Sequence, residues 1–342
     1  MRPAIRPSEI PRVPAGNGPR PFWSVAIPTY NAPADYFEKT LRSVLDQAPG
    51  ADAMQILVVD DCSPQQSSKE LVRRIGGGRV EFYREEKNLG LAGIWNSCIA
   101  RSRGEWVHIL HQDDLVLPGF YEGFRQGLEK NPKAGAAFCR HAFIDGDGHQ
   151  DFLSALERAD AGILENWLER IAVEQVIQTP AIVVKRAVYE EVGGFLPELC
   201  FALDWEMWRR IAARYPFWYE PTVRACYRIH GSSATSRLTQ AALDIDDNMR
   251  SIDIAAEYMP KATARSLTRK AKEYYAIRAV EKAGLLLNAG MIASAFAQVR
   301  GALKCSPTIK VITRVAKFGV RSCLGRLRSS AHAPVAAAPR ND

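Results

Sequence analysis

The chain has 342 residues, of which 47% are hydrophobic and 24% charged, and its formal net charge is +7. These values are those of a soluble globular protein with one large domain and an appendage, or with two domains. No apolar stretch reaches the roughly 18 residues of a membrane-spanning helix, and the Pro- and Arg-rich N-terminus does not resemble a secretory signal. Seven cysteines without a CxxC pair argue against a zinc site and a disulfide framework, and favour a reducing cytoplasm.

The first half of the chain alternates between strand-like and helix-like segments. After a lead at 1–21 that we expect to be disordered, short apolar runs are typical of buried strands, and longer segments carry apolar residues at helical spacing. This alternation predicts an α/β fold with a mainly parallel sheet that helices cover on both faces. The predicted strands are 23–27, 56–59, 80–83, 106–110 and 135–139, and the predicted helices are 35–45, 67–75, 94–101 and 118–129.

The character of the sequence changes near residue 236. Before it, strands at 178–184 and 222–229 and helices at 186–192 and 204–214 continue the α/β pattern. After it, strand signals disappear and long helical stretches follow, at 241–259 and 262–288. We therefore expect four regions, listed by residue number: a disordered lead at 1–21, an α/β domain at 22–238, a helical extension at 239–330 and a disordered tail at 331–342.

The predicted extension is strongly basic. Residues 282–330 contain no Asp or Glu, whereas nine side chains are basic: Lys282, Arg300, Lys304, Lys310, Arg314, Lys317, Arg321, Arg326 and Arg328. From Lys310 onward most of these recur at spacings of three, four or seven residues, which places them along one side of a helix. A basic amphipathic helix of this kind can lie on an anionic membrane surface. The alternative is that the helix packs against the α/β domain or a second subunit.

Two pairs of adjacent aspartates follow predicted strands. Asp60-Asp61 comes directly after the strand 56–59, and Asp113-Asp114 lies just beyond the strand 106–110. Neighbouring carboxylates at such a position repel each other and lose solvation, so a divalent cation or a polar ligand would stabilise them. Open α/β sheets bind their ligands at this end of the strands, which makes both pairs candidates for a binding site.

Seven segments within residues 22–236 together resemble the ordered motifs of a family 2 glycosyltransferase with the GT-A fold, which is Rossmann-like. They are SVAIPTYN at Ser24–Asn31, ILVVDDCS at Ile56–Ser63, NLG at Asn88–Gly90, GEWVHILHQDD at Gly104–Asp114, GGF at Gly193–Phe195, LDWEMWRR at Leu203–Arg210 and YRIHGSS at Tyr227–Ser233. The resemblance implies an inverting enzyme of the bacterial cell-surface polysaccharide type. It would transfer one sugar from a nucleotide-diphosphate sugar, with UDP as the expected nucleotide, to a glycan or a lipid-linked glycan.

The resemblance also assigns the aspartate pairs to the sugar donor. Asp114 would bind a divalent metal, Mn²⁺ or Mg²⁺, which stabilises the diphosphate leaving group. Asp113 would reach the ribose or a metal-bound water, and Asp61 would accept a hydrogen bond from the base. The alternative for each pair is an ordinary turn whose acids cap the next helix.

Loop residues would complete the donor site. By resemblance, the loop formed by Pro28, Thr29, Tyr30 and Asn31 flanks the base or the ribose, with a plain turn as the alternative. Asn88 and Gly90 open the helix that follows strand 80–83, either as donor-binding residues or as a simple cap.

Asp204 is the candidate catalytic base. An inverting transfer needs one carboxylate that takes the proton from the acceptor hydroxyl as this hydroxyl attacks the anomeric carbon. Asp204 begins a predicted helix, so its competing role is an N-cap. Many relatives have Glu-Asp here, whereas this chain has Leu203-Asp204, which puts the contact of the missing Glu in doubt. Glu206 is expected at the surface or behind the base.

Arg228 and His230 alternate along a strand, so both project to one face. The resemblance places this segment near the diphosphate, with Arg228 on phosphate and His230 on phosphate or metal. The alternative for His230 is a structural role, which we also expect for His108. Gly193–Phe195 would either wall the sugar site or form a turn.

Three other functions remain open at this point. A nucleotidyltransferase would normally show a Gly-rich basic loop after its first strand, where this chain has PTYN at 28–31. A nucleic-acid-binding protein would interleave aromatic residues with the basic stripe, which contains only Phe318, so we expect no nucleic-acid partner. A non-catalytic protein that binds nucleotide-sugars is the third alternative. We expect a cytoplasmic protein, with its basic tail at the inner face of the membrane.

Overall fold

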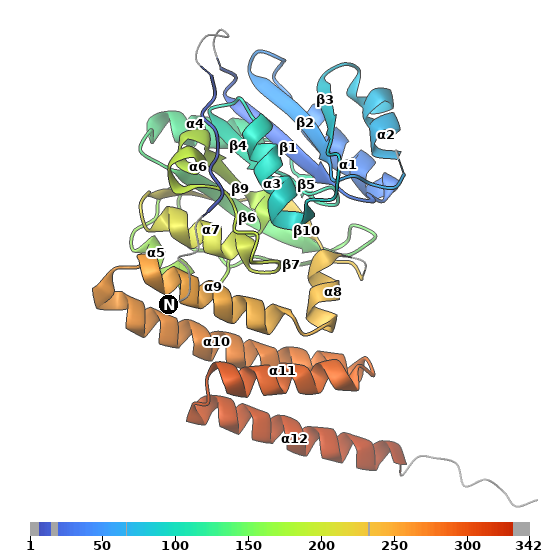
Figure 1. Cartoon of the computed structure of the whole chain (residues 1–342), viewed down its shortest axis with the longest axis vertical. Coiled ribbons are helices and arrows are strands. Elements are labelled where there is room, and N and C mark those ends of the chain that lie inside the picture. Colours follow the sequence, from blue (N-terminus) through green and yellow to red (C-terminus); the bar gives the residue numbers. More distant parts are fainter. Residues whose placement is uncertain (1–6, 15–19, 66, 232, 331–342) are drawn as a thin grey trace, which may run out of the picture.

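The computed structural model describes residues 7–14, 20–65, 67–231 and 233–330 (Figure 1). The strands are β1 (Trp23–Thr29), β2 (Met54–Asp60), β3 (Val80–Arg84), β4 (Trp106–Ile109), β5 (Leu115–Val116), β6 (Ala136–Ile144), β7 (Gln150–Leu153), β8 (Gly162–Ile163), β9 (Ile182–Lys185) and β10 (Phe217–Arg228). The helices are α1 (Ala34–Leu45), α2 (Ser67–Gly76), α3 (Gly90–Arg101), α4 (Phe120–Lys130), α5 (Trp167–Ile171), the 3₁₀ turn η1 (Thr179–Ala181), α6 (Arg186–Val192), α7 (Leu203–Ala212), α8 (Ala234–Gln240), α9 (Asp244–Tyr258), α10 (Lys261–Asn288), α11 (Ile292–Cys305) and α12 (Ile309–Ser330).

A single mixed sheet forms the centre of the first two thirds of the chain. Its strand order is β3-β2-β1-β4-β9-β6-β10-β5, with β7 beside β6 and β8 beside β10. The first four strands are parallel, and β6 is parallel to β10. Only the short β9 separates these two parallel sets, and it runs antiparallel to both of its neighbours. The predicted mainly parallel α/β sheet is therefore confirmed.

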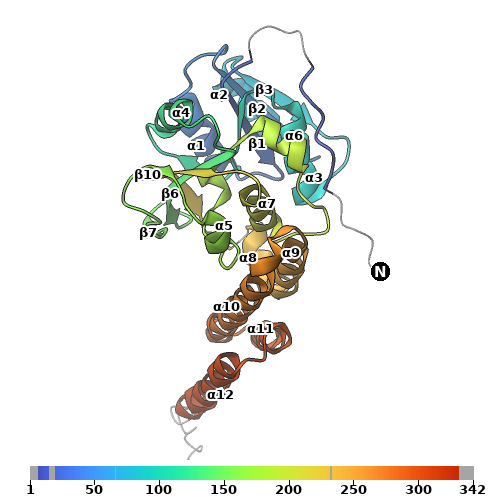
Figure 2. The same cartoon turned by 90° about the vertical axis from the view of Figure 1, so that its left-hand side faces the viewer.

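Helices cover both faces of this sheet, as predicted (Figures 1 and 2). Successive side chains of a strand point to opposite faces, and β1 shows the consequence. Val25 and Ile27 enter a core that α1, α2 and α4 cover, whereas Ala26 enters a second core that α3, α6 and α7 cover. Burial on both faces explains why the strands of the sequence are continuous apolar runs.

Turn chemistry shifts two predicted boundaries. Helix α4 begins at Phe120 instead of Pro118, because Gly119 takes a φ of 80°, which is outside the helical region. The strand predicted at 178–184 is shortened to Ile182–Lys185, since Pro180 lies in the 3₁₀ turn η1.

The prediction of a disordered lead is wrong for residues 7–14. This segment lies along the domain without regular secondary structure, and Ile10 is buried in the core that faces α3 and α6. The carbonyl of Ser8 accepts a hydrogen bond from the amide of Gly194 at 2.8 Å, and the carbonyl of Pro11 accepts one from Arg186 at 2.8 Å. The apolar side chain and these two hydrogen bonds fix a segment whose composition alone resembles a linker.

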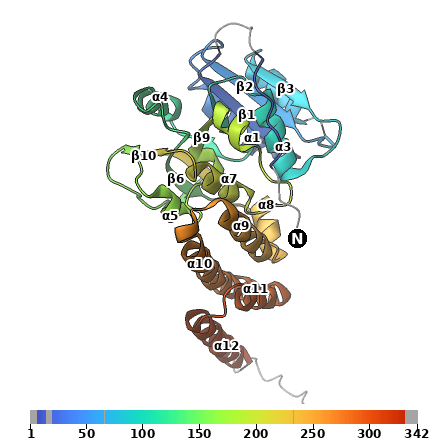
Figure 3. The same ribbon diagram turned by 60° about the vertical axis from the view of Figure 1, so that its left-hand side comes forward.

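The C-terminal helices extend away from the sheet in successive layers (Figures 1 and 3). The first of them, α9, is not separate from the α/β domain, because Ile252 and Ile254 are part of its main core. Asp247 of α9 strengthens this junction. One of its carboxylate oxygens accepts the backbone amides that precede α7, from Cys200 at 3.2 Å, Phe201 at 2.8 Å and Ala202 at 2.8 Å. Helix α9 therefore supports the position of α7.

Replacing Asp247 with alanine is expected to lower the free energy of unfolding by about 3 kcal/mol, because it leaves three amides at the start of α7 without their charged acceptor. Urea denaturation measures the change. The matched control is Asp253→Ala on the same helix, whose exposed ion pair with Lys272 should contribute less than about 1 kcal/mol. Equal losses in the two variants would contradict the proposed support of α7.

Some basic residues of α12 form ion pairs within the protein. Lys310 pairs with Glu273 of α10 at 2.9 Å, and Arg314 lies 3.5 Å from Glu281. On the apolar side of α12, Val311 is fully buried. The first part of α12 therefore packs against the neighbouring helices of the extension, and not against the α/β domain as the alternative had it. The side chains of Arg321 and Arg328 and the tail at 331–342 lie outside the described residues. Within the described ranges, no helix is long and apolar enough to cross a membrane.

Candidate active site

The sheet brings several residues predicted to bind the sugar donor to the carboxyl ends of its parallel strands. The strand order reverses at β1, with β2 and β3 on one side and β4 on the other. Ligands of open α/β sheets bind at the carboxyl ends of the strands beside such a point. The segments that leave these ends carry Tyr30 after β1, Asp61 after β2, and Asp113 and Asp114 after β4.

Asp113 and Asp114 form a compact cluster with His111. One potential ligand atom from each of the three lies within 4.8 Å of the others. Nδ1 of His111 lies 3.4 Å from Oδ2 of Asp114. Among the described residues, however, neither this oxygen nor Nε2 of His111 has a hydrogen-bond partner, although both atoms are buried. Buried polar atoms in native proteins are normally satisfied, so this pair indicates a ligand that supplies the missing bonds.

The charges in this cluster are strongly coupled. Burial raises the pKa of Asp114, against the lowering effect of its contact with His111, and the negative charge of Asp113 raises it further. For His111, burial lowers the pKa, but the contact with Asp114 and the two aspartate charges outweigh burial and raise it overall. A bound cation would keep both carboxylates ionised and the imidazole neutral.

Arg228 holds the aspartate pair in place, and its predicted contact with phosphate stays a prediction. Its amide donates to Oδ1 of Asp114 at 2.8 Å, and its Nε donates to the carbonyl of Asp113 at 2.8 Å. Its Nη1 donates to the carbonyls of Asp145 and Gly146, at 3.0 and 3.1 Å. The guanidinium lies 4.5 Å from the ring centre of Tyr36, and only 2% of the residue is exposed. These contacts occupy Nε and Nη1 of the guanidinium within the protein.

His230 lies beside the cluster and not in it. Its Nε2 is 2.8 Å from Oδ2 of Asp113, but it does not join the three potential ligands His111, Asp113 and Asp114. His230 therefore contacts Asp113, and its predicted role as a phosphate or metal ligand stays a prediction. His111 is the histidine that shares the group of potential ligands with the two aspartates.

Asp61 is hydrogen-bonded to the start of α3. The carboxylate of Asp61 accepts the amides of Leu89 at 2.6 Å and Gly90 at 3.1 Å, and the side chain of Asn88 donates to its carbonyl at 3.1 Å. Gly90 has a φ of 70°, which glycine adopts without strain. Burial raises the pKa of Asp61, and the two amide hydrogen bonds oppose this rise. Asn88 and Gly90 are exposed and remain near Asp61, as the donor-site prediction requires.

The loop after β1 is only partly available to a ligand. Pro28 and Thr29 lie within β1 and are buried, and the hydroxyl of Thr29 donates to Asp60 at 3.2 Å. Their side chains point into the protein, so the prediction that this loop flanks the base or the ribose rests on Tyr30 and Asn31. Tyr30 and Asn31 are exposed. Asn31 has a φ of 48°, and its amide donates to Oγ of Ser63 at 2.9 Å, which fixes the shape of the loop.

Asp204 lies on the first turn of α7 and approaches the cluster of His111, Asp113 and Asp114 from this helix. The N-cap of this helix is Ala202, so the reading of Asp204 as a cap is wrong. One carboxylate oxygen accepts the amide of Trp205 at 2.6 Å, and the other accepts the side-chain amide of Gln175 at 2.8 Å. Burial raises the pKa of Asp204 to about 6, against these two hydrogen bonds and the charge of His111. Asp204 and His111 thus lie close enough to influence each other's charge.

Neighbouring motifs of the sequence are structural. His108 is buried, with its ring nitrogens 3.1 Å from the hydroxyl of Tyr121 and 3.0 Å from the carbonyl of Pro180, as predicted. Glu206 is not at the surface: it is buried and pairs with Arg210 at 2.8 Å. Gly193 has a φ of 82° and ends α6, which favours the turn over a wall of the sugar site.

Comparison with known proteins decides the family. The model of "Glycosyl transferase family 2" matches residues 24–193, which include both aspartate pairs and run from the second residue of β1 to the end of α6. The chain belongs to glycosyl transferase family 2. It is a glycosyltransferase with the GT-A fold, and this assignment excludes the nucleotidyltransferase alternative.

Relatives of this glycosyltransferase come from distant microbes. An uncharacterized glycosyltransferase of Haemophilus influenzae is 25% identical over 74% of this chain and 88% of its own length. TuaG of Bacillus subtilis, which bears the name "Putative teichuronic acid biosynthesis glycosyltransferase", is 34% identical, over 28% of this chain and 37% of its own length.

Solved structures share the fold of the glycosyltransferase at low identity. The mannosyltransferase PcManGT of Pyrobaculum calidifontis, in complex with GDP-Man and Mn²⁺, aligns over 95% of this chain and 85% of its own, with a TM-score of 0.56 and 18% identity. TarS 1–349 of S. aureus, in complex with UDP-GlcNAc, aligns over 83% and 92%, with a TM-score of 0.54 and 14% identity.

Sequence reasoning assigned no role to two residues that the structure places in the candidate site. His111 stands three positions before Asp114, and this spacing could have marked it as a potential ligand. Gln175, which binds Asp204, lies in a segment without a recognisable motif, so only the folded chain reveals it.

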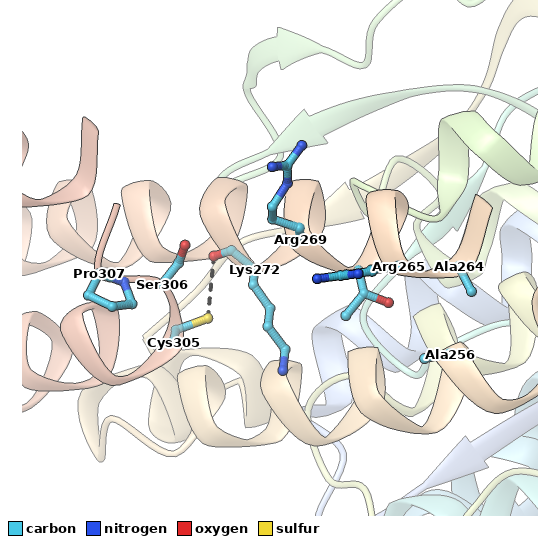
Figure 4. A pocket seen from close by; sticks show the side chains of 9 residues that line it. Ala256, Ala264, Arg265, Arg269, Lys272, Cys305, Ser306 and Pro307 are labelled. Atoms are coloured by element: carbon cyan, nitrogen blue, oxygen red, sulfur yellow. Dashed lines mark hydrogen bonds between the residues drawn. The ribbon is translucent and has the colours of Figure 1, made fainter. Parts of the chain in front are cut away.

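A pocket of about 420 Å³ lies away from this site, where α9, α10 and the connection from α11 to α12 meet (Figure 4). Lys272 is turned towards α9, where it pairs with Asp253 at 2.7 Å. Sγ of Cys305 lies 3.3 Å from the carbonyl of Lys272, which closes one end. None of His111, Asp113 and Asp114 lines this pocket, so the pocket is separate from the candidate donor site.

Proposed function

We propose that this enzyme is an inverting, metal-dependent glycosyltransferase. It would move one sugar from a nucleotide-diphosphate sugar, with UDP as the favoured nucleotide, to a glycan or lipid-linked glycan acceptor in polysaccharide biosynthesis. The observation that carries the proposal is the meeting of His111, Asp113 and Asp114 with Asp204 at the switch point of the sheet. The UDP-GlcNAc complex of TarS, the GDP-Man and Mn²⁺ complex of PcManGT and the biosynthetic role in the name of TuaG support it.

The residues present fit a divalent metal. Carboxylate oxygens suit Mn²⁺ and Mg²⁺, and an imidazole nitrogen is a common additional ligand. Asp114, Asp113 and His111 would hold the ion, and the unpartnered Oδ2 of Asp114 and Nε2 of His111 are its first candidates as ligand atoms. When bound, the metal would stabilise the negative charge of the departing nucleoside diphosphate. Arg228 and His230 would keep the two carboxylates oriented.

Asp204 is the proposed base. A pKa near 6 leaves its carboxylate mostly ionised at neutral pH and still basic enough to accept a proton from an acceptor hydroxyl. Gln175 and the amide of Trp205 hold the carboxylate in one orientation. Direct displacement with one base inverts the anomeric centre, because the hydroxyl attacks from the side opposite the leaving group.

The nucleoside would lie over the loops after β1 and β2. Tyr30 and Asn31 are exposed there, and Asp61 orders the Asn88–Gly90 turn next to them. Both carboxylate oxygens of Asp61 already accept amides, so a base would share an oxygen with the start of α3. We propose that Asp61 fixes this wall of the site and contacts the base through its remaining acceptor capacity.

Thermal-shift measurements with sugar nucleotides test the proposed donor. A ligand that binds only the native state raises the melting temperature. We expect UDP-sugars to raise it in the presence of Mn²⁺, and to raise it less with EDTA or when UMP replaces the diphosphate. A larger shift with GDP-sugars would change the assigned nucleotide. Binding without sugar transfer to any acceptor or to water would favour the non-catalytic alternative.

His111→Gln is expected to weaken Mn²⁺ binding about tenfold or more, because the amide keeps the size of the side chain but is a poorer metal ligand than imidazole. Titration of Mn²⁺ followed by electron paramagnetic resonance measures the affinity directly. His149→Gln is the control, since His149 belongs to an exposed cluster on the hairpin after β6. If His111→Gln bound Mn²⁺ as the wild type does, His111 would not be a ligand.

A further inference from the structure

One face of α11 exposes large apolar side chains. Ile292, Phe296 and Leu303 are 47%, 60% and 38% exposed. Their spacings of four and seven residues place them on the same side of the helix. The opposite side of α11 is buried against α9 and α10, through Ala295 and Ala302 among others. Helix α11 is thus apolar on two sides, and its packing inside the molecule accounts for only one of them.

The exposed stripe lies in a positively charged region. Arg300 lies between Phe296 and Leu303 on the same helix and is exposed, and residues 282–330 contain no acidic residue. Lys304 is also exposed, but it pairs with Asp246 of α9 at 3.2 Å. The end of α10 adds to the apolar surface, because Leu285 is 71% exposed, whereas Lys282 is half-buried and pairs with Asp244 of α9 at 2.5 Å. Figure 2 shows that α11 lies to one side of the line from α10 to α12, so that the stripe is not covered by either neighbour.

This location differs from the one that the sequence indicated. In α12, Val311 is buried and Val315 and Phe318 are partly buried against α10 and α11. Lys310 and Arg314 pair with glutamates of α10. The first part of α12 therefore uses its apolar side and part of its basic side within the protein. Among the α12 side chains that the structure describes, up to residue 319, Ile309 and Ile312 add to the exposed apolar surface, at 84% and 50% exposure.

We propose that the exposed face of α11 docks on an anionic lipid bilayer. Apolar side chains beside lysine and arginine are what a helix needs to lie at the boundary between headgroups and acyl chains. The positive charge provides attraction to anionic headgroups. A second copy of the chain fits less well, because a two-fold contact would bring two regions of the same charge together. The inference does not depend on the proposed donor chemistry, since α9 and α10 separate α11 from the sheet (Figures 1 and 3).

Co-sedimentation of the full chain with lipid vesicles tests the proposal. We expect binding to vesicles that contain phosphatidylglycerol, little binding to pure phosphatidylcholine, and loss of binding at high salt. The double variant Ile292→Ser/Phe296→Ser should bind about tenfold more weakly or worse, because it removes the apolar area that would be buried. The matched control Phe152→Ser/Leu156→Ser changes two side chains of similar exposure, 51% and 53%, on the α/β domain and should bind as the wild type does.

Two charge-reversal variants test the contribution of positive charge. Arg300→Glu should weaken binding several-fold, whereas Arg73→Glu on α2 should not, although both arginines are exposed. Circular dichroism must show the same melting for all variants and the wild type. Absence of binding to anionic vesicles, or equal binding by the α11 variants and their controls, would overturn the proposal. A wild-type dimer in light scattering that the Ile292/Phe296 variant dissociates would also overturn it, because the face would then be a subunit interface.

Discussion

Replacing Asp114 with asparagine is expected to lower the transfer rate with Mn²⁺ about a thousandfold or more. The reason is that a metal at a leaving diphosphate is worth several kcal/mol of transition-state stabilisation, and Asp114 supplies the buried carboxylate of the cluster. Asparagine keeps an oxygen that can accept the amide of Arg228, which now donates to Oδ1 at 2.8 Å. The fold should therefore survive. Release of the nucleoside diphosphate, measured over a range of Mn²⁺ concentrations, shows the effect.

The hairpin after β6 provides the control for this variant. Asp145, Asp147 and His149 form a second group with metal-ligand spacing, but Asp147 and His149 are exposed and Asp145 is occupied by backbone amides. Asp147→Asn should leave the rate and its Mn²⁺ dependence unchanged. If Asp114→Asn turned over donor like the wild type, the cluster of His111, Asp113 and Asp114 would not be the metal site.

The positions of the aspartates could be predicted because they follow from local pattern. An apolar run that ends in acidic residues predicts a strand and a polar loop, and parallel strands align their carboxyl ends. The observed sheet places Asp61 and Asp113 at that edge as expected. The same reasoning placed Asp204 at the start of a helix, and only the identity of the N-cap was wrong.

For Arg228, the sequence pattern did not predict how deeply the side chain is buried. Its alternation with His230 correctly predicted a shared side, but alternation says nothing about depth. The guanidinium is surrounded by the carbonyls of Asp145 and Gly146, on a hairpin more than 80 residues earlier in the chain, and by the ring of Tyr36. These contacts depend on how β6 and β10 pair, which no spacing in the sequence specifies. The same holds for the burial of Ile10 in a lead that composition marks as disordered.

Asp204→Asn is the second variant with a large expected effect. Loss of the base should lower kcat by about 100- to 10,000-fold, while the thermal shift caused by the donor should remain, because Asp204 is proposed to contact the acceptor. In the wild type, kcat/KM should fall as the pH decreases through about 6, since burial raises the pKa of Asp204 to about 6 and only the ionised form accepts a proton. Removing the hydrogen bond of Gln175 with Gln175→Ala should move this inflection to higher pH.

The stability of the same variant separates a catalytic from a structural role. A carboxyl group whose pKa is higher in the folded than in the unfolded state stabilises the fold at low pH, and this contribution is lost as the pH rises through the folded-state pKa. Asparagine does not ionise, so the variant does not lose this stabilisation as the pH rises. Asp204→Asn should therefore melt above the wild type at pH 8, and the difference should shrink as the pH falls below about 6. Asp253→Asn, on the surface of α9, should show neither effect. An inactive Asp204→Asn protein that melts lower at pH 8 would mean that the carboxylate holds α7 instead of serving as the base.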